Sequence, residues 1–230
     1  MYVRAVKVLL VLVLLVAAAW GLARHGRIAN EHALAAVATD LAGRPVGVRC
    51  QGFLAELLDI ESRYGGVRFA DGRPEDHTFL TRETCRRLKR FRTASEHPEL
   101  DCLLMVDWSR WTVPTHFRSA CSERARPAAE ALSTLTHEAM HLRGWIAESQ
   151  AQCYAIQELP WTVERFGGTR AQGAAAASFI LALQAAMPAE YRSSDCRAGG
   201  ALDLHPETTA FPAEERPELL PPRLYGPALQ

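Results

Sequence analysis

Two histidines four residues apart, with a glutamate beside the first, are the residues of this chain best suited to bind a metal ion. The segment reads Leu135-Thr136-His137-Glu138-Ala139-Met140-His141. On an α-helix, positions i and i+4 lie about 40° apart on one face, so both imidazoles can reach one cation. Glu138 points into the same cleft, where its carboxylate can take a proton from a metal-activated water. The spacing therefore predicts a zinc site with a neighbouring catalytic base.

A catalytic zinc ion needs a third protein ligand and keeps one position open. Glu148 is the best candidate for that ligand. On an unbroken helix, Glu148 would lie about 10 Å beyond His141 along the axis, which is too far for one ion. Gly144 is a typical helix terminator, so we expect the chain to turn there. A second helix would then present Glu148 to the histidines.

Other polar residues are weaker candidates for the same site, because no motif surrounds them. The alternative third ligands are Asp107, His116 and His205. A tyrosine, Tyr154 or Tyr191, could stabilise an oxyanion. Such residues are more often ordinary surface, loop or core positions.

The motif and the segment that follows it resemble the gluzincins, zinc peptidases in which a second helix supplies a glutamate as third ligand. Their second helix often reads Asn-Glu-x-x-Ala-Asp, and this chain reads Ala-Glu-Ser-Gln-Ala-Gln over residues 147–152. Glu148 and Ala151 match, whereas Ala147 and Gln152 replace the asparagine and the aspartate. The change at Gln152 matters because that aspartate commonly orients a ligand histidine. A glutamine is a weaker acceptor.

The turn after the motif is short for a gluzincin. His-Glu-x-x-His-x-x-Gly, ending at Gly144, is similar to the corresponding turn of the metzincins, but their third-ligand position is Ala147, which cannot bind metal. The resemblance covers about residues 132–155. It implies a zincin-like helical scaffold, Zn²⁺ held by His137, His141 and Glu148, and hydrolysis of peptide bonds with Glu138 as the catalytic base. It implies no particular substrate.

The hydrophobic pattern predicts a mainly α domain with a small β component, a minimal zincin-like fold behind an N-terminal hydrophobic helix. The helix with the motif, opened by Pro127 in its first turn, is expected to pack an apolar stripe on a core and to show its histidines to a cleft. The stripe comprises Leu132, Leu135, Ala139 and Leu142. Other helices are expected over about 28–42, 81–91, 147–159 (closed by Pro160) and 172–187, and strands over 46–50 and 65–70. The apolar run 53–60 suits a short helix or strand, and 100–106 a strand or a buried turn.

The N-terminus is typical of an export signal or a membrane anchor. Arg4 and Lys7 precede an uncharged run over residues 8–23. Ala17-Ala18-Ala19 offers a signal-peptidase site, whereas Trp20 would suit the membrane interface of an uncleaved anchor. Both readings place the folded domain outside the cytoplasm, either secreted or attached to the cell membrane by a single span.

Six cysteines support the same location, since an even number behind an export signal indicates disulfides. No pair is spaced Cys-x-x-Cys, so a thiolate zinc site is not expected. Fifteen pairings are possible. We predict the sequential one: Cys50–Cys85, Cys102–Cys121 and Cys153–Cys196. The last would rigidify the helix that carries Glu148.

The composition fits one globular domain and no nucleic-acid partner. The formal net charge is zero and hydrophobic residues make up 48% of the 230. We expect a signal or anchor over residues 1–27, a globular domain over 28–204 and a Pro-rich, extended tail over 205–230. The expected function is that of a membrane-anchored or exported zinc metallopeptidase. The alternative is a non-catalytic zinc-binding or disulfide-stabilised structural protein of the cell envelope. Neither substrate nor oligomeric state follows from these residues.

Overall fold

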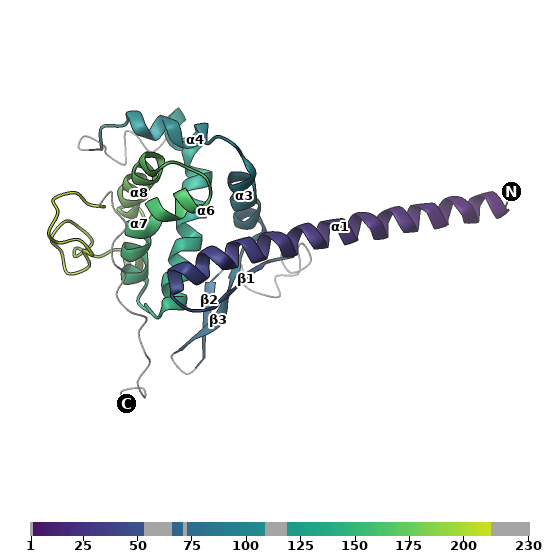
Figure 1. The fold of residues 1–230 in the computed structure, drawn as a ribbon, viewed down its shortest axis with the longest axis horizontal. Helices are drawn as coiled ribbons and strands as arrows, with labels where there is room; N and C mark the ends of the chain where they lie inside the picture. Colours follow the sequence, from purple (N-terminus) through teal and green to yellow (C-terminus); the bar gives the residue numbers. More distant parts are fainter. Residues whose placement is uncertain (1, 53–65, 71–72, 109–118, 213–230) are drawn as a thin grey trace.

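The computed structural model describes residues 2–52, 66–70, 73–108 and 119–212, with side chains from residue 10 onward. It is mainly α-helical with one small sheet, as predicted (Figure 1). The helices are α1 (Tyr2–Ala42), α3 (Arg82–Thr93), α4 (Pro98–Asp101), α6 (Ala120–Arg143), α7 (Glu148–Arg165) and α8 (Arg170–Gln184), with 3₁₀ turns η1 (Cys102–Met105) and η3 (Ala189–Tyr191). The strands are β1 (Gly47–Cys50), β2 (Gly66–Ala70) and β3 (Arg73–Leu80).

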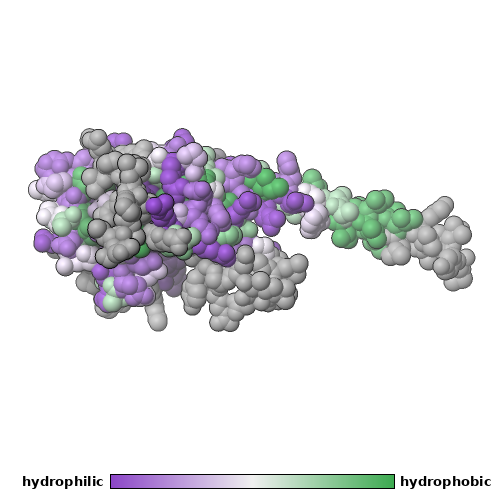
Figure 2. Space-filling view, turned by 90° about the horizontal axis from the view of Figure 1, so that it is seen from below, coloured by the Kyte–Doolittle hydropathy of each residue, from purple (hydrophilic) through white to green (hydrophobic). Residues whose placement is uncertain are grey.

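Helix α1 has two parts with different surroundings. Its N-terminal part projects from the folded body (Figure 1), and its surface is hydrophobic (Figure 2). The large side chains from Leu10 to Val16 are all at least 54% exposed. The helix is long and apolar enough to cross a membrane, a property that a signal sequence near an N-terminus shares. Its C-terminal part buries Leu34, Val37 and Leu41 in the core. The expected boundary at residue 27 therefore lies inside one continuous helix.

The sheet has the order β1-β3-β2, with β1 parallel and β2 antiparallel to β3. The strands predicted over 46–50 and 65–70 are confirmed as β1 and β2. Strand β3 was missed, because its sequence Arg-Pro-Glu-Asp-His-Thr-Phe-Leu carries polar residues at most positions. Only its last residues alternate clearly, with Thr78 and Leu80 buried. The predicted segment 53–60 lies outside the described residues.

Helix α6 is the central element and packs against α1, α3, α7, α8 and the sheet. From Ala131 to Arg143 every residue except Thr134 is buried. The polar side of the helix is thus covered as fully as its apolar stripe. The prediction that Pro127 opens this helix is wrong. Helix α6 begins at Ala120, because the Ser119 hydroxyl accepts a hydrogen bond from the Ser122 N–H at 3.1 Å and caps the first turn.

Helix α7 lies between α6 and α8, and it continues through Pro160 to Arg165. The prediction that Pro160 closes this helix is therefore wrong. At this point α8 packs closely on α7, since a Cβ on Gly173 would lie 2.6 Å from Pro160 Cα. Helix α8 begins at Arg170 behind Thr169, whose side chain forms a capping box with Gln172.

Three disulfides connect these elements, and all three follow the predicted sequential pairing. Cys50–Cys85 joins β1 to α3, Cys102–Cys121 joins η1 to α6, and Cys153–Cys196 joins α7 to the segment after η3. Every cysteine of the chain is paired. This arrangement indicates an oxidising compartment and, with the apolar helix, supports a membrane or extracellular location.

The structure differs from the sequence predictions in the segment 100–106 and in the Pro-rich tail. The apolar run 100–106 is neither a strand nor a simple turn, since its residues form the end of α4 and the 3₁₀ turn η1. Pro98 fits the first turn of α4, which favours the helical start. In the Pro-rich tail, Phe211 packs against the hydrophobic core, so the folded part extends beyond residue 204. Residues 213–230 lie outside the described part.

Candidate metal centre

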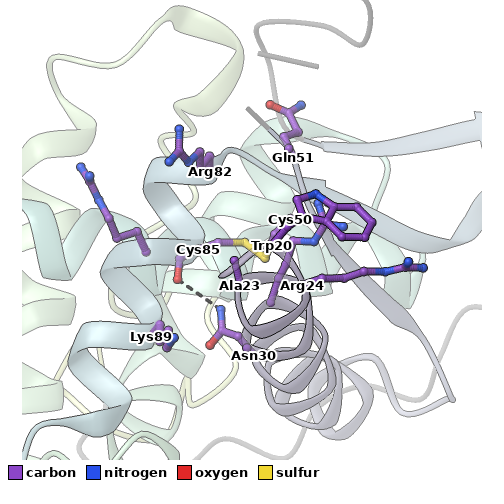
Figure 3. A pocket seen from close by; sticks show the side chains of 13 residues that line it. Trp20, Ala23, Arg24, Asn30, Cys50, Gln51, Arg82, Cys85 and Lys89 are labelled. Atoms are coloured by element: carbon purple, nitrogen blue, oxygen red, sulfur yellow. Dashed lines mark hydrogen bonds between the residues drawn. A yellow bond between two sulfur atoms is a disulfide. The ribbon is translucent and has the colours of Figure 1, made fainter. Parts of the chain in front are cut away.

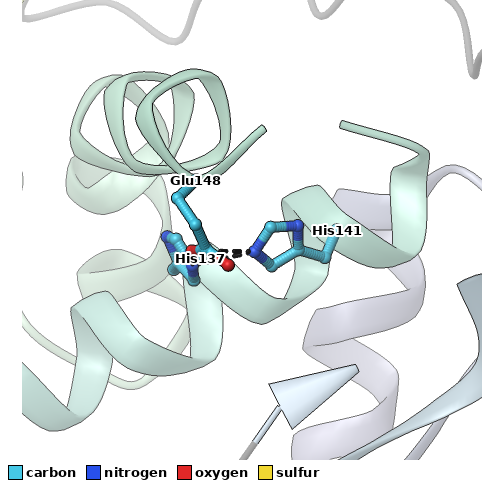
Figure 4. A group of neighbouring side chains, drawn as sticks. All are labelled: His137, His141 and Glu148. Atoms are coloured by element: carbon cyan, nitrogen blue, oxygen red, sulfur yellow. Dashed lines mark hydrogen bonds and ion pairs between the residues drawn. The ribbon is translucent and has the colours of Figure 1, made fainter. Parts of the chain in front are cut away.

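The side chains of His137, His141 and Glu148 converge at one point between α6 and the start of α7 (Figure 4). His137 Nε2 lies 3.0 Å from Glu148 Oε2, and His141 Nε2 lies 3.3 Å from the same oxygen. The two Nε2 atoms are 3.0 Å apart. These three residues, predicted from the sequence, form a group that could hold a metal ion.

The three donor atoms fit a tetrahedral zinc ion in chemistry and in spacing. Two imidazole nitrogens and one carboxylate oxygen are a ligand set of catalytic zinc sites. Zinc–ligand bonds of 2.0–2.2 Å at tetrahedral angles require ligand atoms about 3.3 Å apart. The observed separations of 3.0, 3.0 and 3.3 Å lie close to this value. Little movement of the side chains is therefore needed.

The turn after α6 determines the orientation of His141. Gly144 ends the helix at φ 114°, with its N–H bonded to the His141 carbonyl and the Trp145 N–H bonded to the Met140 carbonyl. This is the hydrogen-bond pattern of a Schellman turn. It places the Trp145 carbonyl 2.6 Å from His141 Nδ1. Since a carbonyl only accepts, Nδ1 carries the proton and the Nε2 lone pair is left for a metal.

His137 is held by packing rather than by a hydrogen bond on its second nitrogen. Its ring stands edge-on to His141 at a centroid distance of 4.6 Å and lies 5.7 Å from the Tyr191 ring. His137 Nδ1 is buried and has no hydrogen-bond partner in the described structure. In gluzincins an aspartate at the position of Gln152 orients a ligand histidine. Here Gln152 does not do so through Nδ1, because His137 Nδ1 has no partner in the described structure and His141 Nδ1 contacts the Trp145 carbonyl.

Glu138 is held against the sheet beside the cluster. The Val67 N–H donates to Glu138 Oε2 at 2.9 Å, and the Thr78 hydroxyl donates to the same oxygen at 3.4 Å. Neither of these two contacts involves Oε1. Burial raises the pKa of the Glu138 carboxyl, and the nearby charges of His137 and His141 act in the opposite direction. A carboxylate in these surroundings can accept a proton more readily than one in water.

The Glu148 side chain is the more open part of the cluster, at 37% exposure. Close contact with the His137 and His141 imidazoles holds the pKa of the Glu148 carboxyl far below its usual range, so the group stays ionised. Tyr191, from η3, lies at the same opening. Burial and the Glu148 and Glu138 carboxylates raise the pKa of its phenol, which therefore keeps its proton. Tyr191 is thus placed as a hydrogen-bond donor at the site.

The other weaker candidates are not part of this group. The Tyr154 ring packs on the Trp145 ring at a centroid distance of 4.7 Å, next to the turn that follows α6. Asp107 is exposed, and His205 pairs with Glu207. His116 lies outside the described residues.

No protein-family model, curated protein or solved structure matches this chain.

Three contacts of the site were missed from the sequence: those of the Val67 N–H, the Thr78 hydroxyl and the Trp145 carbonyl. Two of them are backbone groups, which carry no residue-type signal. The Trp145 contact could have been anticipated, because a glycine after the second histidine predicts the Schellman turn that positions this carbonyl.

Replacing Gly144 with alanine is expected to destabilise the fold by about 1–3 kcal/mol and to weaken metal binding. A Cβ at φ 114° is strained, and relief of that strain moves both the Trp145 carbonyl and Glu148. Urea unfolding and zinc titration would measure the two effects. Gly199→Ala is the matched control, since φ there is 65° and a Cβ meets nothing within 4 Å. It should cost stability without changing zinc affinity, and equal zinc loss in both variants would contradict the assignment.

Proposed function

We propose that this chain is a zinc-dependent metallopeptidase-like protein, anchored in a membrane or exported. The observation that carries the proposal is the meeting of His137, His141 and Glu148 beside Glu138. The ligand set is chemically that of a hydrolytic zinc site. The resemblance to gluzincins supports zinc over other ions, and the donor spacing is compatible with it.

Zinc, when bound, would supply a Lewis acid that polarises a peptide carbonyl and makes a nearby water acidic. The chain's own residues supply the remaining functions. Glu138, held at Oε2 by Val67 and Thr78, takes the proton of the attacking water and passes it to the leaving amine. Tyr191 donates a hydrogen bond to the oxygen on which negative charge develops.

A non-catalytic zinc site is the second candidate, and burial favours it. His137, Glu138 and His141 expose at most 7% of their surface. A zinc ion bound by His137, His141 and Glu148 could hold α6 and α7 together as a structural element. Both candidates predict bound zinc, and hydrolysis that depends on Glu138 separates them.

The first experiment is the zinc content of the full-length chain, purified in detergent under oxidising conditions. We expect about one zinc per chain, with a large loss in His137→Ala and in Glu148→Ala, because each change removes one of three protein ligands. Metal content is measured on the folded variants by elemental analysis.

Asp107→Ala and His205→Ala are the controls, because both residues lie outside the group in the described structure. They should bind zinc as the wild type does. If zinc is lost in His137→Ala but retained in Glu148→Ala, the metal site is supported and Glu148 is not its third ligand. A folded wild type without zinc would refute the proposed function.

A further inference from the structure

A cavity lies where α1 leaves the folded body, between α1, the end of β1 and α3 (Figure 3). Its volume is about 420 Å³. The walls come from three elements: α1 over 20–30, the end of β1 with Gln51 and Gly52, and α3 over 82–89. The metal ligands and Glu138 are not among its lining residues, so it is separate from the candidate metal centre.

The lining of this cavity is strongly basic. Five of its described lining residues are cations and none is a carboxylate: Arg24, Arg27, Arg82, Arg86 and Lys89. Arg86 pairs with Glu83, and the Arg24 guanidinium lies over the Trp20 ring at 5.5 Å. Several cations facing one cavity repel each other, and an anion placed between them relieves that repulsion.

Two of these cations end close to a glycine on another wall of the cavity. A Cβ on Gly52 would lie 3.3 Å from Arg27 Nη1, and a Cβ on Gly26 would lie 3.7 Å from Lys89 Nζ. Arg27 comes from α1 and Lys89 from α3, so the two charges approach from different walls. An arginine fork and a lysine point charge are the side chains that bind phosphate best in proteins.

The walls are fixed in place by covalent and hydrogen bonds. The Cys50–Cys85 disulfide joins β1 to α3 within the cavity lining. Asn30 Nδ2 donates to the Cys85 carbonyl at 3.3 Å, which ties α1 to α3 (Figure 3). The cavity is therefore formed before any ligand binds, which reduces the entropy cost of binding.

The position of the cavity along α1 indicates where its anion comes from. The exposed apolar part of the helix ends near Trp20 and Leu22, and Trp20 lines the cavity. A helix rises 1.5 Å per residue, so Arg24 and Arg27 lie about 6 and 10 Å beyond Trp20. The headgroup layer of a bilayer is about 5–7 Å deep on each side. With Trp20 at the inner edge of this layer, Arg24 lies at the level of the lipid phosphates. Arg27 starts just beyond the layer, and its long side chain can reach back to the phosphates.

We propose that this cavity binds the phosphate headgroup of an anionic phospholipid in the leaflet next to the folded domain. The proposal rests on membrane insertion of α1 and is independent of the proposed peptidase activity. Such a lipid would be held between Arg27 and Lys89, with its acyl chains along the apolar part of α1. Binding would fix the folded domain at a defined height and tilt above the membrane.

The test is the lipid retained by the full-length chain in detergent micelles that contain equal amounts of phosphatidylglycerol and phosphatidylcholine. Native mass spectrometry counts both lipids per chain. We expect one phosphatidylglycerol bound in preference to phosphatidylcholine. The double variant Arg27→Gln, Lys89→Gln should lower this preference at least about fivefold, since each cation near an anionic lipid contributes a factor of about five.

The matched control is Arg90→Gln with Arg124→Gln, which removes two exposed cations outside the cavity lining. It should keep the wild-type preference, and both double variants are checked for intact disulfides and unchanged helical content. Equal loss in the two variants, or no preference in the wild type, would overturn the proposal. Displacement of the lipid by millimolar inorganic phosphate as readily as by short-chain phosphatidylglycerol would overturn the lipid assignment in favour of a free-phosphate site.

Discussion

Changing Glu138 to glutamine is expected to lower the rate of peptide-bond hydrolysis about 10²- to 10⁴-fold while zinc content stays unchanged. The amide cannot take a proton from the attacking water. Its oxygen can still accept the hydrogen bonds that Val67 and Thr78 give to Oε2. Glu138 is not one of the three clustered ligands, so the metal should remain bound. A library of quenched fluorescent peptides, with zinc analysis of the same samples, measures both quantities.

Glu130→Gln is the matched control for this change. Glu130 lies two helical turns before His137 on α6 and contacts Arg126 at 3.9 Å rather than the cluster. Its variant should hydrolyse peptides as the wild type does. Full activity in Glu138→Gln would refute Glu138 as the base. Zinc binding in a wild type that cleaves no peptide would instead favour the non-catalytic alternative.

The sequence predicted the group of His137, His141 and Glu148 because the governing rules are local. The i, i+4 spacing on a helix needs no tertiary information. The glycine that returns the chain after α6 is likewise visible in the sequence. The sequential disulfide pairing is also confirmed. However, no local rule selects it from the fifteen possible pairings.

The errors arose where tertiary packing overrides local rules. Pro127 and Pro160 are both helix breakers by propensity. Each lies inside a helix, because α6 begins earlier, at the Ser119 cap, and α7 continues past Pro160 where it packs against α6 and α8. Strand β3 was missed because its polar residues are stabilised by pairing on both sides, with β1 and with β2.

The basic cavity was also not predicted. Its lining residues are scattered from Trp20 to Lys89, and each cation looks like an ordinary surface residue in the sequence. Only the disulfide and the packing of α1 on α3 bring them together. The candidate metal centre, in contrast, spans twelve consecutive residues from His137 to Glu148. Local periodicity can therefore predict a site built from one short segment better than a site built from distant segments.

Removing the Cys153–Cys196 disulfide with a double alanine variant is expected to destabilise the fold by about 4 kcal/mol and to weaken zinc binding. The sequence separation of 43 residues gives a stability loss of this size from loop entropy alone. Cys153 lies little more than one helical turn after Glu148 on α7. The same helix is held to the segment after Cys196 by Gln157, whose amide donates to the Leu202 carbonyl at 2.8 Å. Loosening that segment frees the helix that presents Glu148, so affinity for zinc falls with stability.

The double variant Cys102→Ala, Cys121→Ala separates the two effects. The two cysteines of this disulfide are 19 residues apart, which predicts a comparable loss of folding stability of about 3 kcal/mol. Cys121, however, lies about 24 Å before His137 along α6, far from the candidate metal centre. Urea unfolding and chelator competition at a temperature where both variants are folded would compare them. Weaker zinc binding in the Cys153–Cys196 variant alone would show that this disulfide positions the third ligand. Equal affinities would show that α7 holds Glu148 without it, because the packing of α7 against α6 and α8 would then be sufficient.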